Sequence, residues 1–214
     1  CGAGTFLVRS YSRLKYLAQQ QVTTHKQLLE QLWSCDIAKF PAHLAMMNLA
    51  MLDLSERENF PYIKNCDAFD ILPQQGKFTT HKHEGVRHQF RDISGSNMIE
   101  VRVPMLDAIV GNPPYIRQEK IENKEKLEQI VGRAWGKDFT LNKQADIYAY
   151  FFLHNASFLR EGGRLGFVTS NSWLDVRYGA KMQANFCQFF KIIAIVGSQV
   201  ERDFSQADVN SVIT

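Results

Sequence analysis

The sequence lacks the features that define several protein classes. No apolar run approaches the ~18 residues that a membrane-spanning helix needs, so no membrane partner is expected. No secretory signal opens the chain. The four cysteines lie far apart and form no CxxC pair, which argues against a zinc site or a disulfide framework. We therefore expect free thiols and a reducing, cytoplasmic compartment.

Charge of one sign is not in large excess either. The 25 Lys and Arg residues face 22 Asp and Glu residues, a formal net charge of +3. This balance permits a polyanion partner without requiring one. The segment 77–102 is locally basic, and two interpretations stay open: a solvated loop, or a loop that faces phosphates. His81 and His83 alternate within it without an evident third ligand, so no metal site is expected.

The residues that are present indicate an α/β protein. The length of 214 residues, with 45% hydrophobic and 22% charged, suits one globular domain. Helical stretches alternate with short β-rich runs, which is typical of helices packed on a mostly parallel sheet. We expect helices within residues 4–20, 41–52, 119–133, 145–159 and 173–190, and strands within 29–35, 62–66, 105–110, 164–169, 192–196 and 209–214.

Polar residues follow several of these strands directly. Asp36, Asp67, Asn112 and Ser170 each stand where an expected strand ends. In an open α/β sheet, ligands bind just beyond the carboxyl ends of the strands. The pattern therefore predicts one crevice that gathers these four positions.

A glycine turn, Gly2-Ala3-Gly4, opens the first expected helix. Two glycines let a backbone approach a ligand closely, and the helix N-terminus offers unpaired N–H groups. Leu7 replaces the third glycine of the dinucleotide fingerprint, so a nucleoside without a pyrophosphate fits better. Such a turn normally follows a strand, and none precedes Cys1. We therefore expect the native polypeptide to extend upstream, and downstream as well.

The two aspartates each have two interpretations. Asp36 either accepts hydrogen bonds from ribose hydroxyls or caps the helix that follows it. Asp67 either receives the amino group of an adenine, through its carboxylate or the neighbouring backbone, or is a turn residue.

The segment Asp107–Tyr115 decides between classes of chemistry. Pro113 and Pro114 lack backbone donors and fix φ near −65°, and each pushes the residue before it into an extended conformation. The result is a stiff corner with carbonyls turned outward, beside the Asn112 amide oxygen and the Tyr115 ring. Two acceptors beside an aromatic face suit a planar group that carries an amine. A simple proline-rich turn at a strand end is the less favoured alternative.

These segments, in this order, resemble the N6-adenine DNA methyltransferases of bacterial restriction–modification systems, the gamma group of the amino-methyltransferases that use S-adenosylmethionine. Residues 1–7 are similar to the cofactor loop of that family, and residues 107–115 to its catalytic segment. Residues 112–119 resemble the subgroup in which methylase and nuclease are often fused. The segments 146–148, 162–173 and 204–213 follow later motifs. The resemblance implies an α/β, Rossmann-like fold with a mostly parallel twisted sheet flanked by helices, here without its first strand.

The resemblance also implies roles for matched residues. The cofactor-binding set would be Cys1, Gly2, Ala3, Gly4 and Thr5 at the methionine end, Asp36 for the ribose hydroxyls and Asp67 for the adenine, with the adjacent Ile37 and Ala68 and with Asn112. The catalytic set would be Asn112, Pro113, Pro114 and Tyr115. Asn112 and the Pro113 carbonyl would accept the two N6 protons of a flipped-out adenine. Tyr115 would stack on that base, and Phe204 would cover its other face.

The implied reaction is direct methyl transfer to adenine in double-stranded DNA. Residues 1–214 would form the catalytic domain, as a fragment, with target recognition and any nuclease in other domains or chains. Two alternatives remain from the residues: a methyltransferase acting on RNA adenine or on a protein glutamine, or a cofactor- and DNA-binding module without activity.

Overall fold

The chain folds into two compact units. The computed structural model describes residues 1–19, 21–55, 61–73, 87–91, 98–136, 141, 144–175, 179–197 and 211–214. The first unit comprises Cys1–Leu72 and Gly85–Val103, and the second Pro73–Glu84 and Pro104–Thr214. No helix within the described ranges is long and apolar enough to cross a membrane.

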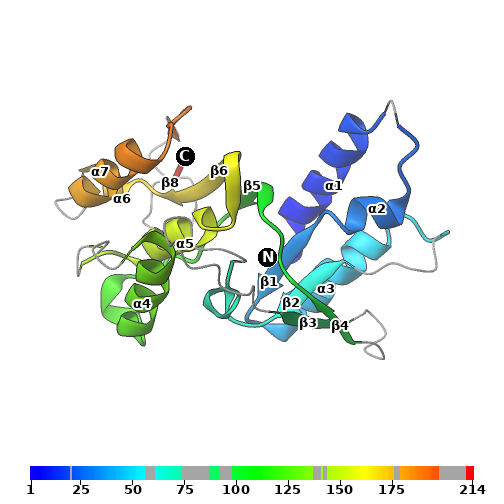
Figure 1. Cartoon of the computed structure of the whole chain (residues 1–214), viewed down its shortest axis with the longest axis horizontal. Coiled ribbons are helices and arrows are strands. Elements are labelled where there is room, and N and C mark those ends of the chain that lie inside the picture. Colours follow the sequence, from blue (N-terminus) through cyan, green and yellow to red (C-terminus); the bar gives the residue numbers. More distant parts are fainter. Residues whose placement is uncertain are drawn as a thin grey trace. The chain divides into compact units, whose positions relative to one another are not determined.

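The first unit combines three helices with two strand pairs (Figure 1). Its elements are α1 (Thr5–Leu17), α2 (His25–Leu29), β1 (Trp33–Asp36), α3 (Lys39–Ala50), β2 (Tyr62–Asn65), η1 (Ala68–Asp70), β3 (His88–Arg91) and β4 (Met98–Val101).

Strands β1 and β2 lie parallel, with Asp36 paired to Asn65 at their carboxyl ends. The Trp33 and Tyr62 rings stack across the two strands at 4.2 Å between centroids, and the Phe90 ring of β3 contacts both rings edge-on. This aromatic cluster fixes the register of the pair. As a result, the residues that follow β1 and β2 lie next to each other.

The core of the first unit lies among the three helices and β2. Leu7 and Tyr11 enter it from α1, and Ala45 and Leu49 from α3, each at most 8% exposed. The remaining buried members are Leu28, Leu29, Leu32, Ala42, Met46 and Ile63. The small side chain of Ala45 lets α3 approach the turn before α1 closely.

The second unit is built on a four-stranded sheet. Its elements are β5 (Leu106–Gly111), η2 (Gln118–Lys120), α4 (Lys124–Trp135), α5 (Ile147–Ala156), β6 (Leu159–Ser170), α6 (Ser172–Asp175), α7 (Gly179–Phe189), β7 (Val196–Gly197) and β8 (Ser211–Ile213). The strand order is β5-β6-β8-β7.

Strand direction in this sheet is mixed, whereas a mostly parallel sheet was expected. β5 and β6 are parallel, while β8 is antiparallel to both β6 and β7. It follows that β5, β6 and β7 share one direction and that β8 alone is reversed among the described strands. A reversed strand in an otherwise parallel sheet is common in α/β proteins. The α/β class is therefore confirmed.

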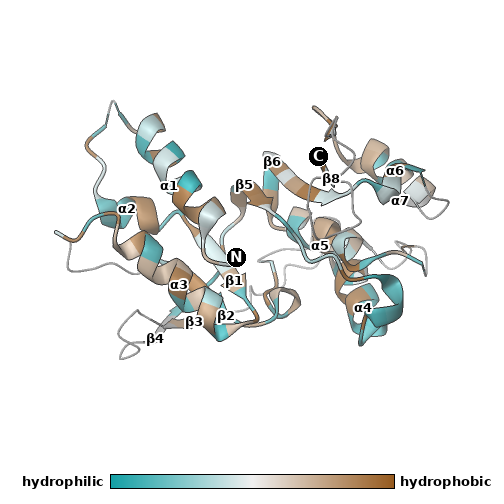
Figure 2. Cartoon of the chain, turned by 180° about the vertical axis from the view of Figure 1, so that it is seen from behind, coloured by the Kyte–Doolittle hydropathy of each residue, from teal (hydrophilic) through white to brown (hydrophobic). Residues whose placement is uncertain are grey.

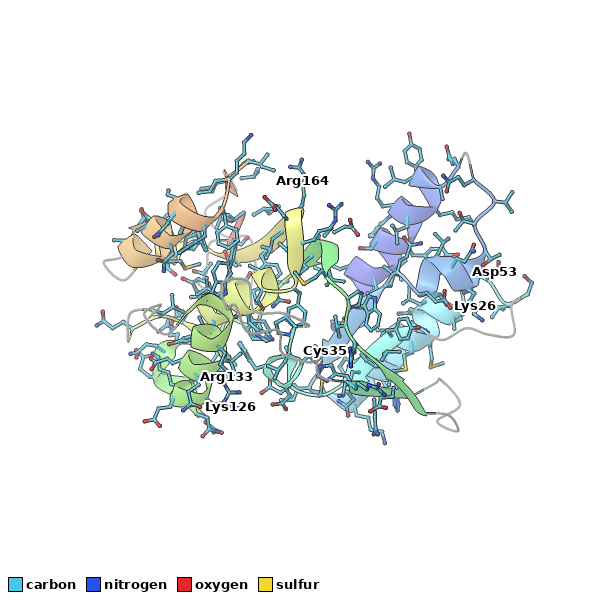
Figure 3. All side chains as sticks on the ribbon, in the orientation of Figure 1. Lys26, Cys35, Asp53, Lys126, Arg133 and Arg164 are labelled. Carbon is cyan, nitrogen blue, oxygen red and sulfur yellow. The ribbon has the colours of Figure 1, made fainter. Side chains whose placement is uncertain are left out.

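Helices α4 and α5 differ in how they are solvated. The buried residues of α5 include Tyr148, Tyr150 and Phe152. Helix α4 is amphipathic, with its outer side hydrophilic in Figure 2 and with Lys126 and Arg133 projecting from it in Figure 3. The outer face of α4 is therefore hydrophilic.

Several boundaries were predicted wrongly. The helix expected within residues 119–133 begins at Lys124 rather than at Glu119, which lies in the short 3-10 helix η2. Sequence analysis missed α2, which has five residues and is set by a capping box of Thr24 and Gln27. It also placed a loop over residues 77–102, where 88–91 and 98–101 form an antiparallel hairpin. Of the expected strand 192–196, only Val196 lies in a strand, the two-residue β7.

Candidate functional site

The glycine turn adopts the conformation that glycine alone adopts readily. Gly2 and Gly4 have φ of 54° and 86°, in the left-handed region. The Gly4 N–H donates to the Cys1 carbonyl at 3.1 Å, and α1 begins at the next residue. Leu7 is buried in the core, which explains why no third glycine is needed there. The first N–H groups of α1 are left without intrahelical partners, as at any helix start.

Asp36 connects this turn to the end of β1. One carboxylate oxygen accepts the Gly2 N–H at 2.8 Å and the Cys1 nitrogen at 2.9 Å, and the other accepts the Ala38 N–H at 2.9 Å. Burial raises the pKa of Asp36, but these hydrogen bonds outweigh it, so the pKa lies below its ordinary value. The helix-cap interpretation was wrong, because Ala38 occupies the N-cap of α3 without a side-chain bond.

Asp67 follows β2 at the neighbouring position. It caps the short helix η1, with its Oδ1 accepting the Phe69 N–H at 3.0 Å. Asp67 is therefore a turn residue, and its role toward an adenine stays a prediction. The Cys66 N–H donates to the Asp36 carbonyl at 3.0 Å, which draws the two strand ends together. Beside them, the Ile37 side chain is 75% exposed.

Two asparagines that sequence analysis assigned no role contact these loops. The Asn65 Nδ2 donates to the carbonyls of Asp36 and Ile37, both at 2.9 Å. The Asn48 Nδ2, from α3, donates to the Ala3 carbonyl at 2.9 Å. All three bonds join residues more than 25 positions apart, so no local sequence signal could have indicated them.

In the second unit, residues 112–115 leave the carboxyl end of β5. Asn112 is exposed, Pro113 is buried, and Tyr115 is 38% exposed. The Tyr115 hydroxyl donates to the Val168 carbonyl of β6 at 3.4 Å. Among the described residues, no hydrogen bond engages the Asn112 carboxamide. The predicted corner therefore presents an exposed amide and a half-exposed aromatic ring.

A row of hydroxyl groups lies at the carboxyl end of β6, the strand paired with β5. The Ser170 hydroxyl donates to the Ser172 Oγ at 2.9 Å, and the Tyr148 hydroxyl lies 3.3 Å from the same oxygen. Trp173 packs edge-on against Phe186 at 5.3 Å and is 1% exposed. Trp173 is therefore a packing residue.

The structure thus brings the predicted residues together in two sets. The first unit joins the glycine turn, Asp36, Ile37 and the end of β2 with Asp67 and Ala68. The second joins Asn112–Tyr115 with the end of β6. Phe204, His81 and His83 lie outside the described residues. Within the portion that the structure describes, no three His, Cys, Asp or Glu residues are grouped as a metal site would need.

The chain also matches a known protein family over most of its length. Residues 30–202 match the model of the Eco57I restriction-modification methylase family. The match covers most of the chain, including β1, β2, the 112–115 corner and the hydroxyl row. The chain belongs to the Eco57I restriction-modification methylase family.

Named relatives are similar to parts of this chain. The Type II methyltransferase M.BstVI of Geobacillus stearothermophilus is 33% identical over 90 residues, 42% of this chain and 15% of that protein. M.XhoI of Xanthomonas vasicola is 34% identical over 90 residues, 42% of this chain and 16% of that protein. M.HincII of Haemophilus influenzae is 25% identical over 178 residues, 79% of this chain and 35% of that protein. The chain thus aligns with about a third of these relatives or less.

A solved structure shares the fold. It is the Type IIL restriction-modification enzyme MmeI in complex with DNA, which superimposes with a TM-score of 0.55 at 19% identity. The superposition covers 100% of this chain and 30% of the MmeI chain.

Proposed function

We propose that this chain is the catalytic part of a DNA methyltransferase of a restriction–modification system, which transfers a methyl group from S-adenosylmethionine to the N6 amine of a flipped-out adenine. The observation that carries the proposal is the exposed Asn112 carboxamide on a double-proline corner at the end of β5, next to the half-exposed Tyr115 ring. Family membership, the names of the Type II methyltransferase relatives, and the DNA in the MmeI structure support it.

The first unit has features that suit the cofactor. The position of a Cβ on Gly2 has no atom within 4 Å, so a ligand could approach the backbone of the turn. Asp36 is anchored by its hydrogen bonds, and its Oδ1, which accepts only from the Ala38 N–H, keeps a lone pair for a ribose hydroxyl. Residues 1–5 would border the methionine end, Ile37 would cover an apolar face, and Asp67 with Ala68 would meet the adenine. When bound, the cofactor supplies an electrophilic methyl group. A Rossmann-like arrangement of the whole fold is part of this proposal.

The 112–115 corner would act on the substrate amine. The lone pair of an exocyclic amine is delocalised into the ring, so the amine is a weak nucleophile. Acceptors at the Asn112 Oδ1 and the Pro113 carbonyl would hold both N–H groups and favour a pyramidal nitrogen with its lone pair turned to the methyl group. Positioning and electrostatics would supply most of the rate.

The aromatic ring would help to hold the extruded base. Flipping a nucleotide costs a few kcal/mol, and stacking on an aromatic side chain contributes ~1–3 kcal/mol per base. Tyr115 could therefore offset much of the cost, with Phe204 on the opposite face. Sequence-specific recognition and any nuclease activity would belong to other domains, fused or separate.

The test is methyl incorporation by the full-length protein. Labelled S-adenosylmethionine is supplied with duplex DNA, with RNA, and with a glutamine-bearing release-factor peptide. We expect label at adenine N6 in duplex DNA, and a loss of roughly 10²–10³-fold in kcat for Asn112→Ala. Gln129→Ala, which removes an exposed amide from α4, is the matched control and should retain activity. Label in the peptide or the RNA, or equal activity of Asn112→Ala, would refute the proposal.

A further inference from the structure

We propose that Asn65 and Asn48 are positioning residues for cofactor binding, through the two loops that they hold. The inference rests on the proposed cofactor site and deepens it. It assigns the preorganisation of that site to two amide side chains that do not themselves touch the ligand.

Asn65 holds the loop that follows β1. Its single Nδ2 group donates to two consecutive carbonyls, those of Asp36 and Ile37, each at 2.9 Å. Because Asp36 and Asn65 are register partners in parallel strands, the amide reaches past the end of β1 without distortion. Both donors of the amide are thereby used on one short loop.

Hydrogen bonds consequently hold both the backbone carbonyl and the carboxylate of Asp36. Its carbonyl accepts from Asn65 and from the Cys66 N–H at 3.0 Å, and its carboxylate accepts from Gly2 and Ala38. The bonds to the carboxylate orient the head group, and those to the carbonyl orient the backbone that carries it. Loss of the Asn65 donors would leave the carboxylate attached to a backbone that is less well defined.

Asn48 holds the glycine turn in the same way. It projects from α3 and donates to the Ala3 carbonyl at 2.9 Å. The same helix places Ala45 directly against Gly4. Helix α3 therefore supports the turn at two successive residues, by a packing contact and by a hydrogen bond.

These bonds should matter more for binding than for folding. Asn65 is exposed and Asn48 half-buried, so water can replace either partner when the bond is lost. The Ala3 and Ile37 carbonyls belong to a turn and a loop, and the Asp36 carbonyl belongs to the last residue of β1. A loop that is already ordered loses less entropy when a ligand binds, so the bonds would stabilise the complex more than the free fold.

The experiment uses the full-length protein and its variants Asn65→Ala and Asn48→Ala. We expect the Kd and KM for S-adenosylmethionine to rise about tenfold, with kcat at saturating cofactor within twofold of wild type. The midpoint of urea unfolding should stay close to wild type. The matched control is Gln31→Ala, which removes an exposed amide whose Nε2 donates to the Gln27 carbonyl at 3.0 Å, away from both loops.

A second ligand separates positioning from general damage. Asn65→Ala should raise the Kd for S-adenosylhomocysteine about tenfold. The Kd for its 2′,3′-dideoxy analogue should rise less than twofold, because the analogue lacks the hydroxyls that Asp36 would bind. Equal weakening of both ligands, or a Kd within twofold of wild type, would overturn the role of Asn65. If Asn65→Ala no longer unfolds cooperatively, the cofactor affinity of Asn48→Ala tests the inference instead. A Kd of wild-type size in that variant overturns the inference.

Failure of the inference differs from failure of the proposed function. Wild-type protein that binds neither S-adenosylmethionine nor S-adenosylhomocysteine refutes the proposed function and the inference with it. Wild-type protein that binds both, with variants that bind equally well, refutes the inference alone.

Discussion

Gly4 and Ala45 lie so close that a Cβ on Gly4 would stand 2.9 Å from the Ala45 Cβ. Gly4 also has φ of 86°, so glycine is required there both by conformation and by space. The turn that opens α1 is therefore seated directly on α3. The turn that would border the methionine end of the cofactor and the helix that supports it therefore form one packed structure.

Substituting Gly4 should cost more stability than substituting Gly2. Gly2→Ala should lower the free energy of unfolding by about 1–2 kcal/mol, the cost of the left-handed conformation alone, because its Cβ would enter open space. Gly4→Ala adds a clash with a buried helix, which we expect to lower the free energy of unfolding by at least about 1 kcal/mol more. Urea denaturation of both variants measures the difference. Equal losses would show that α3 yields to the added methyl group.

Tyr115 should act through its ring more than through its hydroxyl. The hydroxyl donates to the Val168 carbonyl at 3.4 Å, a long bond at a partly exposed site. We expect Tyr115→Phe to change the KM for DNA by less than fivefold. Tyr115→Ala removes the stacking surface, worth ~1–3 kcal/mol, and should raise that KM by roughly 5- to 150-fold. Steady-state methylation of a single-site duplex gives both values, and the reverse order would exclude stacking.

Sequence reasoning located residues whose environment is local. The acids at strand ends, the glycine turn and the 112–115 corner follow from short-range conformational preferences of Gly and Pro and from the position of polar residues after β-rich runs. The antiparallel pair of β3 and β4 was missed because the charges of residues 77–102 suggested a loop.

Residues that act through distant partners could not be predicted. The role of Asn65 depends on the register of β1 against β2, and that register is set by the Trp33–Tyr62 stack. Asn48 depends on how closely α3 approaches the turn, which Ala45 permits. Both are tertiary consequences of packing. The helix-cap interpretation of Asp36 was wrong for a related reason, since the carboxylate accepts the Gly2 N–H from a distant part of the unit and Ala38 is the N-cap of α3.

The Cys35 and Cys66 thiols form an asymmetric pair beside Asp36 (Figure 3 labels Cys35). The interaction between the two thiols raises the pKa of Cys35 and lowers the pKa of Cys66. Because a lowered pKa means more thiolate at a given pH, we expect iodoacetamide to modify Cys66 faster than Cys35 near neutral pH. Cys35→Ala should slow the modification of Cys66. Peptide mapping by mass spectrometry measures both rates, and modification in urea calibrates intrinsic reactivity. An unchanged Cys66 rate would contradict the pairing.

His88 should make the first unit sensitive to mild acid. It is 3% exposed on β3, and its Nε2 accepts the Leu72 N–H at 3.3 Å, so that nitrogen carries no proton. Burial and the nearby Lys64 charge lower its pKa below the ordinary value of 6.5. Between the folded and unfolded pKa values, His88 is therefore protonated in the unfolded chain but neutral in the folded chain. Stability from this group is complete above about pH 6.5 and falls as the pH drops toward the folded pKa.

Comparison of wild type with His88→Gln isolates this contribution. Glutamine can offer its amide oxygen to the Leu72 N–H but does not titrate, so the variant should lose less stability than wild type between about pH 6.5 and 5. At pH 8 the variant should be no more stable than wild type, because the imidazole is then neutral and fully packed. Urea denaturation across this range, followed by the fluorescence of Trp33 in the adjacent aromatic cluster, reports on the first unit. Parallel pH profiles for the two proteins would mean that the buried ring is not the source of the acid sensitivity.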